Sequence, residues 1–165
     1  METTGTLENK IVTTDLNLHY GTNHALKDIN LDIYTNKITA FIGPSGCGKS
    51  TLGRVVLNLL EPTSGQVFID GQEMYKLHGA AQKTMRMRAQ MIFQDPYSSL
   101  NPRMSVSEII AEPLIANKLM TDKREIQGRV EQLMETVGLA QRFINAYPHE
   151  LDGGRRQRIG VARAL

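Results

Sequence analysis

The chain has 165 residues, of which 41% are hydrophobic and 22% charged, and a net charge of +2 at neutral pH. This length suits a single domain with a hydrophobic core. So small a net charge does not by itself indicate nucleic-acid binding. The one cysteine, Cys47, excludes an internal disulfide framework and suits a reducing compartment. We find no secretory signal and no apolar run of membrane-spanning length, and therefore expect a soluble, cytoplasmic protein.

The first half of the chain is predicted to be rich in strands. Residues 11–20 alternate well enough for a strand, and the turn at 21–23 leads to a second strand whose alternate residues from Ile29 to Ile33 are apolar. Residues 66–70 predict a further strand, which an Asp-Gly turn closes. Strands joined by short turns in this way indicate a strand-rich first part of the chain.

Residues 37–51 combine a short apolar run, a glycine-rich turn and the start of a helix. They match Gly-x-x-x-x-Gly-Lys-Ser/Thr at every required position. The apolar run predicts a strand over 37–42, and apolar residues at helical spacing predict a helix from about Lys49 to Leu60. Glycines allow positive φ angles, which turn backbone N–H groups inward around a phosphate. The chain is therefore predicted to bind a nucleoside triphosphate.

Each part of this loop has a predicted role. The helix that starts near Gly48 adds unpaired N–H groups and the positive end of its dipole. Lys49 supplies a mobile cation for the β- and γ-phosphates, and the Ser50 hydroxyl is placed to coordinate Mg²⁺. We interpret Cys47 as a small side chain in the loop rather than a redox sensor. The residues predicted to hold the nucleotide are Gly43, Pro44, Ser45, Gly46, Cys47, Gly48, Lys49, Ser50 and Thr51.

Two other features each allow two interpretations. Tyr20 lies just before a turn, where an aromatic ring either packs in the core or stacks on a purine, and the pattern alone favours the core. Residues 76–89 carry Lys83, Arg86 and Arg88 among Met and Ala. Such a run can form a basic patch for nucleic acid, but it is more typical of a solvated helix face.

The second half of the chain is predicted to be helical. Residues 90–94 form a short apolar strand that ends at Gln94, and helices follow. Ser105 and a glutamate three residues later predict a capping box, and Pro113 is expected to kink or end that helix. A further helix begins near Asp122 and stops at Gly138.

The last stretch begins with Leu151-Asp152-Gly153-Gly154-Arg155. Asp152 can cap a helix whose first turn contains both glycines, which leaves a second set of unpaired N–H groups. This helix start is a second predicted phosphate contact.

A phosphate loop, a glutamine at a strand end, a helical lobe and a Gly-Gly helix start with a basic tail, in this order, resemble the ATP-binding subunits of ABC transporters. The resemblance spans residues 11–165. It implies an α/β fold with an incomplete P-loop NTPase core, an antiparallel β subdomain and a helical lobe. The implied divisions are 1–95 for the core with its β subdomain, 96–148 for the helical lobe and 149–165 for the signature helix.

The resemblance also implies roles for single residues. Tyr20 matches the aromatic residue that stacks on adenine, which reverses its interpretation as core. Gln94 matches the glutamine that contacts Mg²⁺ and the attacking water, so Lys49 and Gln94 are the implied catalytic residues and Ser50 and Gln94 the implied metal contacts. ATP would lie between two chains in a head-to-tail dimer, in which the signature of one chain reaches the γ-phosphate held by the other. The signature residues are Asp152, Gly153, Gly154 and Arg155.

The two ends of the chain resemble different subfamilies. Residues 11–50 look like the phosphate importer ATPase, whereas 51–165 are similar to oligopeptide and dipeptide importer ATPases. We therefore hypothesise a chimera that is joined near the phosphate loop. The resemblance implies that the helical lobe binds membrane-spanning subunits at the inner face of the cell membrane, that the transported solute is a peptide or phosphate, and that nucleic acid is not a partner.

Two departures from the family pattern affect the expected activity. Asp152 and Arg155 replace the Ser and Gln of the family signature, and a carboxylate repels phosphate unless Arg155 offsets it. The family's Walker B strand, which supplies a catalytic Glu, would follow the signature helix, and no such strand precedes Leu165. We therefore expect slow or absent hydrolysis and an incomplete sheet with an exposed edge. The alternative to an importer subunit is a non-hydrolysing nucleotide-binding or interaction fragment.

Overall fold

The computed structural model describes residues 8–165, apart from the side chains of Pro96 and Ser98, and shows two compact units. The first unit ends at Gln90, and the second comprises Met91–Leu165. The division of the chain into 1–95, 96–148 and 149–165 stays a prediction, and the first seven residues of its core lie outside the described part. None of the described helices is both long enough and apolar enough to span a bilayer.

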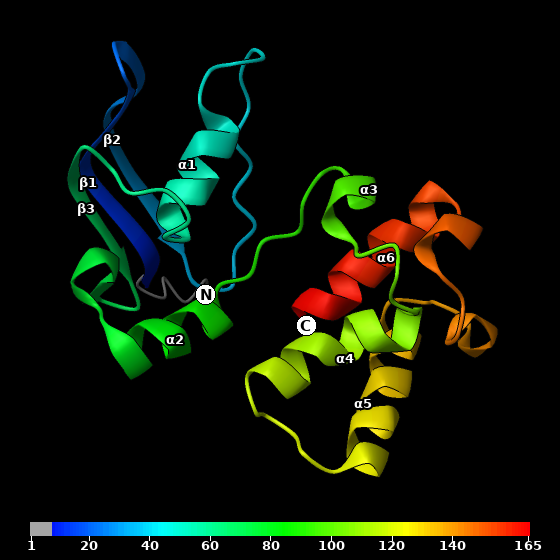
Figure 1. Cartoon of the computed structure of the whole chain (residues 1–165). Helices are drawn as coiled ribbons and strands as arrows, with labels where there is room; N and C mark the ends of the chain where they lie inside the picture. The colour runs from blue at the N-terminus through cyan, green and yellow to red at the C-terminus, as the bar shows by residue number, and fades with distance from the viewer. Residues whose placement is uncertain (1–7) are drawn as a thin grey trace, which may run out of the picture. The chain divides into compact units, whose positions relative to one another are not determined.

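A four-stranded antiparallel sheet with the order β2-β1-β3-β4 forms the first unit's framework (Figure 1). Strands β1 (Asn9–Tyr20) and β2 (Asn23–Tyr34) make a long hairpin, β3 (Ser64–Ile69) pairs with β1, and the short β4 (Gln72–Glu73) pairs with β3. These strands contain the segments predicted at 11–20, 29–33 and 66–70, and the predicted antiparallel β subdomain is therefore confirmed.

Helices α1 (Lys49–Val56) and α2 (Gly79–Arg88) and the 3₁₀ turn η1 (Met74–Lys76) supply apolar side chains to one core with this sheet. Helix α1 was predicted to reach Leu60 but ends at Val56, because Asn58 takes a left-handed conformation with φ of 54°. Asparagine tolerates that conformation, which terminates helices. The buried residues of this core are Leu16, Leu18, Leu26, Leu52, Val55, Val56, Val67, Ile69, Met74 and Met85.

Two predicted strands are wrong. The segments 37–42 and 90–94 have no strand pairing among the described residues, and Ile38 and Ile42 are 101% and 96% exposed. A strand persists only where a neighbouring strand satisfies its backbone N–H and C=O groups. No described strand lies beside either segment, so the central sheet of the predicted P-loop core is incomplete in this part of the chain.

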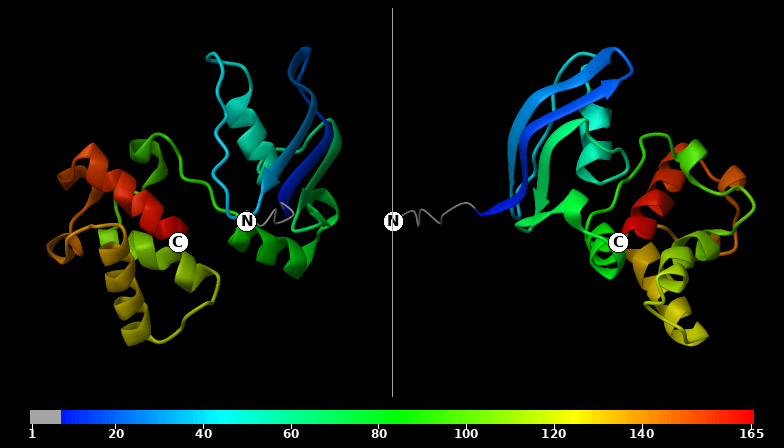
Figure 2. Two further views of the ribbon diagram at one scale, coloured as in Figure 1. Left: turned by 180° about the vertical axis from the view of Figure 1, so that it is seen from behind. Right: turned by 60° about the vertical axis from the view of Figure 1, so that its left-hand side comes forward.

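The second unit is helical (Figure 2). Its helices are α3 (Pro96–Ser99), α4 (Val106–Ala116), α5 (Lys123–Thr136) and α6 (Gly153–Ala164), with 3₁₀ turns η2 (Gln141–Phe143) and η3 (Pro148–Glu150). Helices α4, α5 and α6 share a core that includes Ile109, Met134 and Ile159. Pro113 does not end its helix, which continues to Ala116.

The predicted helix starts are formed by local hydrogen bonds. Asp122 accepts from the N–H groups of Arg124 and Glu125 at 2.8 and 3.0 Å and so caps α5. Ser105 and Glu108 form the predicted capping box of α4. The Glu108 carboxylate accepts from the backbone N–H of Ser105 at 2.7 Å and from its hydroxyl at 2.9 Å. These two bonds, the backbone one first, hold the pKa of Glu108 below its ordinary value of 4.5.

The lowered pKa of Glu108 predicts an acid-dependent loss of stability. A carboxyl group whose pKa is lower in the folded chain contributes stability above its unfolded pKa, and this contribution disappears as the pH falls through the folded pKa. Glu108→Gln keeps an acceptor at this cap but does not titrate. We therefore expect the difference in free energy of unfolding between wild type and Glu108→Gln to shrink from pH 6 to pH 3, as measured by urea denaturation. Parallel pH profiles for the two proteins would contradict this assignment.

Candidate nucleotide-binding site

The turn at residues 43–48 and the first residues of α1 form the centre of the site. Gly46 and Gly48 have φ angles of 81° and 94°, which side chains strongly disfavour. Gly48 is the N-cap of α1 and presses against β2, since a β-carbon there would lie 2.9 Å from the carbonyl oxygen of Ala25. The glycines thus let the loop turn directly against the hairpin, with the N-terminus of α1 open to a ligand.

The ammonium group of Lys49 is held by the loop that precedes it. Its Nζ donates to the carbonyl oxygens of Gly43 and Pro44, both at 2.8 Å, and to Sγ of Cys47 at 3.3 Å. An ammonium has three hydrogen atoms, and each has an acceptor here. A phosphate oxygen that binds Lys49 must therefore share or replace one of these contacts. These contacts fix the cation at the turn that the sequence predicts to bind a triphosphate.

Tyr20 lies on the same cavity as the loop. The cavity has a volume of about 470 Å³, and the Tyr20 residue is 47% exposed rather than buried in the core. The structure therefore brings the predicted base platform and the predicted phosphate loop together within one unit. The hairpin lines the cavity with residues that include Tyr20, Asn23, His24 and Lys27, and the loop and α1 line it with Gly46, Cys47, Gly48 and Thr51.

The sequence analysis missed the polar residues of β2 in this cavity. The turn at Gly21 pairs Tyr20 with Asn23 and His19 with His24. The imidazole rings of His19 and His24 stack with their centroids 3.9 Å apart. The hairpin register is the signal that could have identified these polar residues, because it pairs the residues after the turn with Tyr20 and His19 before it.

The remaining predicted site residues belong to the second unit. Gln94 is exposed and lies outside any regular element. The Asp152 side chain caps α6 by accepting from the N–H of Arg155 at 2.8 Å. Its second oxygen forms an ion pair with the Arg155 guanidinium at 2.5 Å. Gly153 and Gly154 occupy the first turn of α6, as predicted. The two substitutions in the signature thus form a pair in which each charge has an opposite partner.

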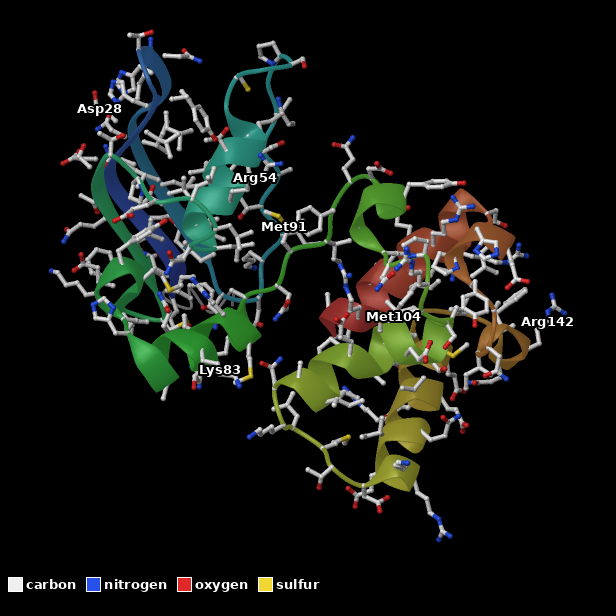
Figure 3. The ribbon with its side chains drawn as sticks, in the orientation of Figure 1. Asp28, Arg54, Lys83, Met91, Met104 and Arg142 are labelled. Carbon is white, nitrogen blue, oxygen red and sulfur yellow. The ribbon has the colours of Figure 1, made fainter. Side chains whose placement is uncertain are left out.

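A cavity of about 380 Å³ lies next to this helix start and is lined by Arg142, Arg155 and Arg158 together with Phe143. The guanidinium carbons of Arg142 and Arg155 each lie 4.9 Å from the centre of the Phe143 ring. Arg142 extends outward from the 3₁₀ turn η2 (Figure 3). Three guanidinium groups thus line the cavity beside Asp152, and the ion pair of Asp152 is with Arg155.

Comparison with known families identifies this arrangement. A family model described as "ABC transporter" matches residues 26–165. The chain belongs to the ABC transporter family. This membership agrees with the phosphate loop at the start of α1 and with the Gly-Gly start of α6.

Curated relatives from peptide importers are similar to most of this ABC family chain. The oligopeptide transport ATP-binding protein OppF of Bacillus subtilis is 49% identical over 149 residues, which cover 88% of this chain and 48% of that protein. The dipeptide transport ATP-binding protein DppF of Lactococcus lactis is 46% identical over 147 residues, which cover 88% and 47%. The chain thus spans about half the length of the curated relatives it matches.

These matches correct one prediction. Each covers more of the chain than residues 51–165 alone, so the similarity to peptide importers continues across the phosphate loop. Nothing in the comparisons supports a phosphate-importer segment over residues 11–50 or a chimera.

Solved structures confirm the predicted α/β fold class as part of an ABC ATPase domain. The dimeric ATP-binding cassette MJ0796, bound to ADP and Pi, superposes with a TM-score of 0.82 at 29% identity, covering 94% of this chain and 68% of that chain. CbiO1 of Clostridium perfringens, part of the transporter complex CbiONQ, gives a TM-score of 0.81 at 28% identity, covering 96% and 61%.

Proposed function

We propose that this chain is the nucleotide-binding part of a peptide importer's ATP-binding subunit, and that it binds Mg-ATP on residues 43–51. The observation that carries the proposal is the shared cavity, which Tyr20 on the hairpin lines together with Gly46, Cys47 and Gly48 of the loop. Lys49 follows these residues directly, and its ammonium is tethered to the same loop. Tyr20 would stack on adenine, and Lys49 would bind the β- and γ-phosphates. The similarity to OppF and DppF supports a peptide as the solute of the complete transporter.

The oxygen donors of the chain suit magnesium. Mg²⁺ keeps several waters and takes few protein ligands beside the nucleotide's own phosphates. The Ser50 hydroxyl is exposed at the start of α1, next to Lys49, and the Gln94 amide oxygen is an acceptor of the same hard type. Ser50 would hold the ion, which neutralises phosphate charge when bound, and the family resemblance implies Gln94 as a second contact. Gln94 would also orient the attacking water in the complete protein.

The partners follow from the same proposal. Asp152, Gly153, Gly154 and Arg155 would contact nucleotide held by a second copy in a head-to-tail dimer, an arrangement that the dimeric MJ0796 cassette supports. The Asp152–Arg155 ion pair makes this contact less repulsive than a lone carboxylate would be. The helical lobe would dock on membrane-spanning subunits, so the protein would be peripheral on the inner face of the membrane.

Titration of the chain with Mg-ATP tests the proposal. We expect the backbone amide signals of residues 43–51 to shift in a saturable way, and inorganic triphosphate to shift part of the same set. A parallel assay of phosphate release separates binding from turnover. A folded sample whose loop signals stay unmoved by Mg-ATP would overturn the proposal.

A further inference from the structure

The wall of the nucleotide cavity contains a histidine between its two ends. Ala25 lies at the phosphate end, because its carbonyl oxygen is the neighbour that a β-carbon on Gly48 would meet at 2.9 Å. Tyr20 and its strand partner Asn23 mark the other end. His24 lines the cavity and lies between Asn23 and Ala25 along β2. A strand rises about 3.4 Å per residue, so roughly 7 Å separate the two ends along the strand.

A polar network in the hairpin determines which ring nitrogen of this histidine carries a hydrogen atom. The amide nitrogen of Asn17 donates to the backbone oxygen of Asp15 and to a carboxylate oxygen of Asp28, both at 2.9 Å. Asp28 projects from the hairpin (Figure 3). Because both partners can only accept, the amide nitrogen and oxygen of Asn17 are assigned without ambiguity.

The orientation of Asn17 determines the tautomer of His24. The Asn17 side-chain oxygen accepts from the N–H of Asp28 at 3.0 Å and lies 2.8 Å from Nε2 of His24. An amide oxygen cannot donate, so Nε2 carries the hydrogen in this contact. In the neutral ring, Nδ1 is then the acceptor. Among the residues that the structure describes, none forms a hydrogen bond with Nδ1. The stacked ring of His19 covers one face of the His24 imidazole.

We propose that His24 is a nucleotide-specificity residue whose Nδ1 accepts a hydrogen bond from a ribose hydroxyl of ATP. This inference rests on the proposed binding of ATP between the phosphate loop and Tyr20. In a nucleoside triphosphate the ribose joins the α-phosphate to the base, and His24 holds the same middle position between the loop contact at Ala25 and the platform at Tyr20. A ribose hydroxyl is a donor, which suits the acceptor that Asn17 leaves on the ring. Asn17 acts as the positioning residue.

The test compares ATP with 2′,3′-dideoxy-ATP, which lacks both hydroxyls, in Mg²⁺ buffer by calorimetry. Wild type is expected to bind ATP about three- to tenfold more tightly, the range that one neutral hydrogen bond supplies. His24→Phe keeps a ring that can stack on His19 but has no acceptor, and we expect it to bind both nucleotides within about twofold of each other. Asn17→Ala should reduce the preference in the same direction, because the tautomer is then no longer fixed.

Lys27→Ala is the matched control, since Lys27 lines the same cavity on the same strand. Its loss should change both affinities equally and leave their ratio as in wild type. Equal binding of the two nucleotides by wild type would overturn the role of His24 while ATP binding itself stands, and so would a preference that His24→Phe retains. Binding of neither ATP nor inorganic triphosphate would instead remove the proposed function.

Discussion

Lys49→Ala is expected to weaken the binding of Mg-ATP by about a hundredfold or more. A hydrogen bond from a charged donor contributes about 1.5–3 kcal/mol, and the ammonium is proposed to bind two phosphates. The same change removes the contacts from Nζ to the carbonyl oxygens of Gly43 and Pro44 that close the turn. Calorimetric titration with Mg-ATP and with inorganic triphosphate measures the effect, and both ligands should lose affinity because the loss concerns the phosphates.

Lys37→Ala is the control for net charge. Lys37 is exposed in the segment before the loop, and its replacement by alanine removes the same unit of charge as Lys49→Ala. Exposed charges act weakly over distance in salt, so its ATP affinity should stay within about twofold of wild type. If Lys49→Ala kept wild-type affinity, the phosphate loop would not be the binding site. A loss of affinity in Lys37→Ala as large as in Lys49→Ala would show that the net charge of the chain, and not a contact from Lys49, determines the affinity.

Gly65→Ala is expected to destabilise the first unit by about 3 kcal/mol or more. Gly65 has a φ of 92°, and a β-carbon there would lie 2.4 Å from the backbone oxygen of Asp15 and 2.6 Å from Cα of Leu16. Those neighbours are backbone atoms of the adjacent strand β1, which cannot move aside alone. Asp15 itself has a φ of 45° where the register of β1 shifts, so the glycine faces a bulge. Urea denaturation followed by circular dichroism measures the loss.

Gly71→Ala separates the cost of the close contact at Gly65 from the cost of the backbone angle. Gly71 follows β3 and has a φ of 72°, but a β-carbon there would have no neighbour within 4 Å. Its cost should be about 1–2 kcal/mol, the penalty for a left-handed alanine. Equal destabilisation by the two substitutions would mean that the approach of β1 and β3 at Gly65 contributes nothing.

Signals that act within a few residues predicted the fold well. The caps at Ser105 and Asp152 need only a side chain that can reach a backbone N–H three residues further on, and both are formed. The helix predicted to begin near Asp122 also starts there. The hairpin of β1 and β2 follows from alternation on both sides of a short turn. The phosphate loop is a motif of adjacent residues, and its backbone geometry is built into its glycines.

Features that depend on distant partners could not be predicted in this way. The apolar runs at 37–42 and 90–94 have strand-like composition, yet no described neighbour pairs with them. The place of His24 depends on its strand partner His19 and on the contact of β2 with Gly48, which no single run of residues shows. Asn17 bonds Asp28 across the hairpin, and that contact depends on bulges whose positions the alternation pattern does not specify.

The segment at 37–42 has a consequence for how the protein behaves when concentrated. Its backbone N–H and C=O groups form no bonds with other described residues, and the side chains of Ile38 and Ile42 face solvent. Unpaired backbone with apolar side chains is a template for strand addition between molecules. Two copies that meet through this segment can satisfy each other's amides, and crowding would therefore favour self-association through it.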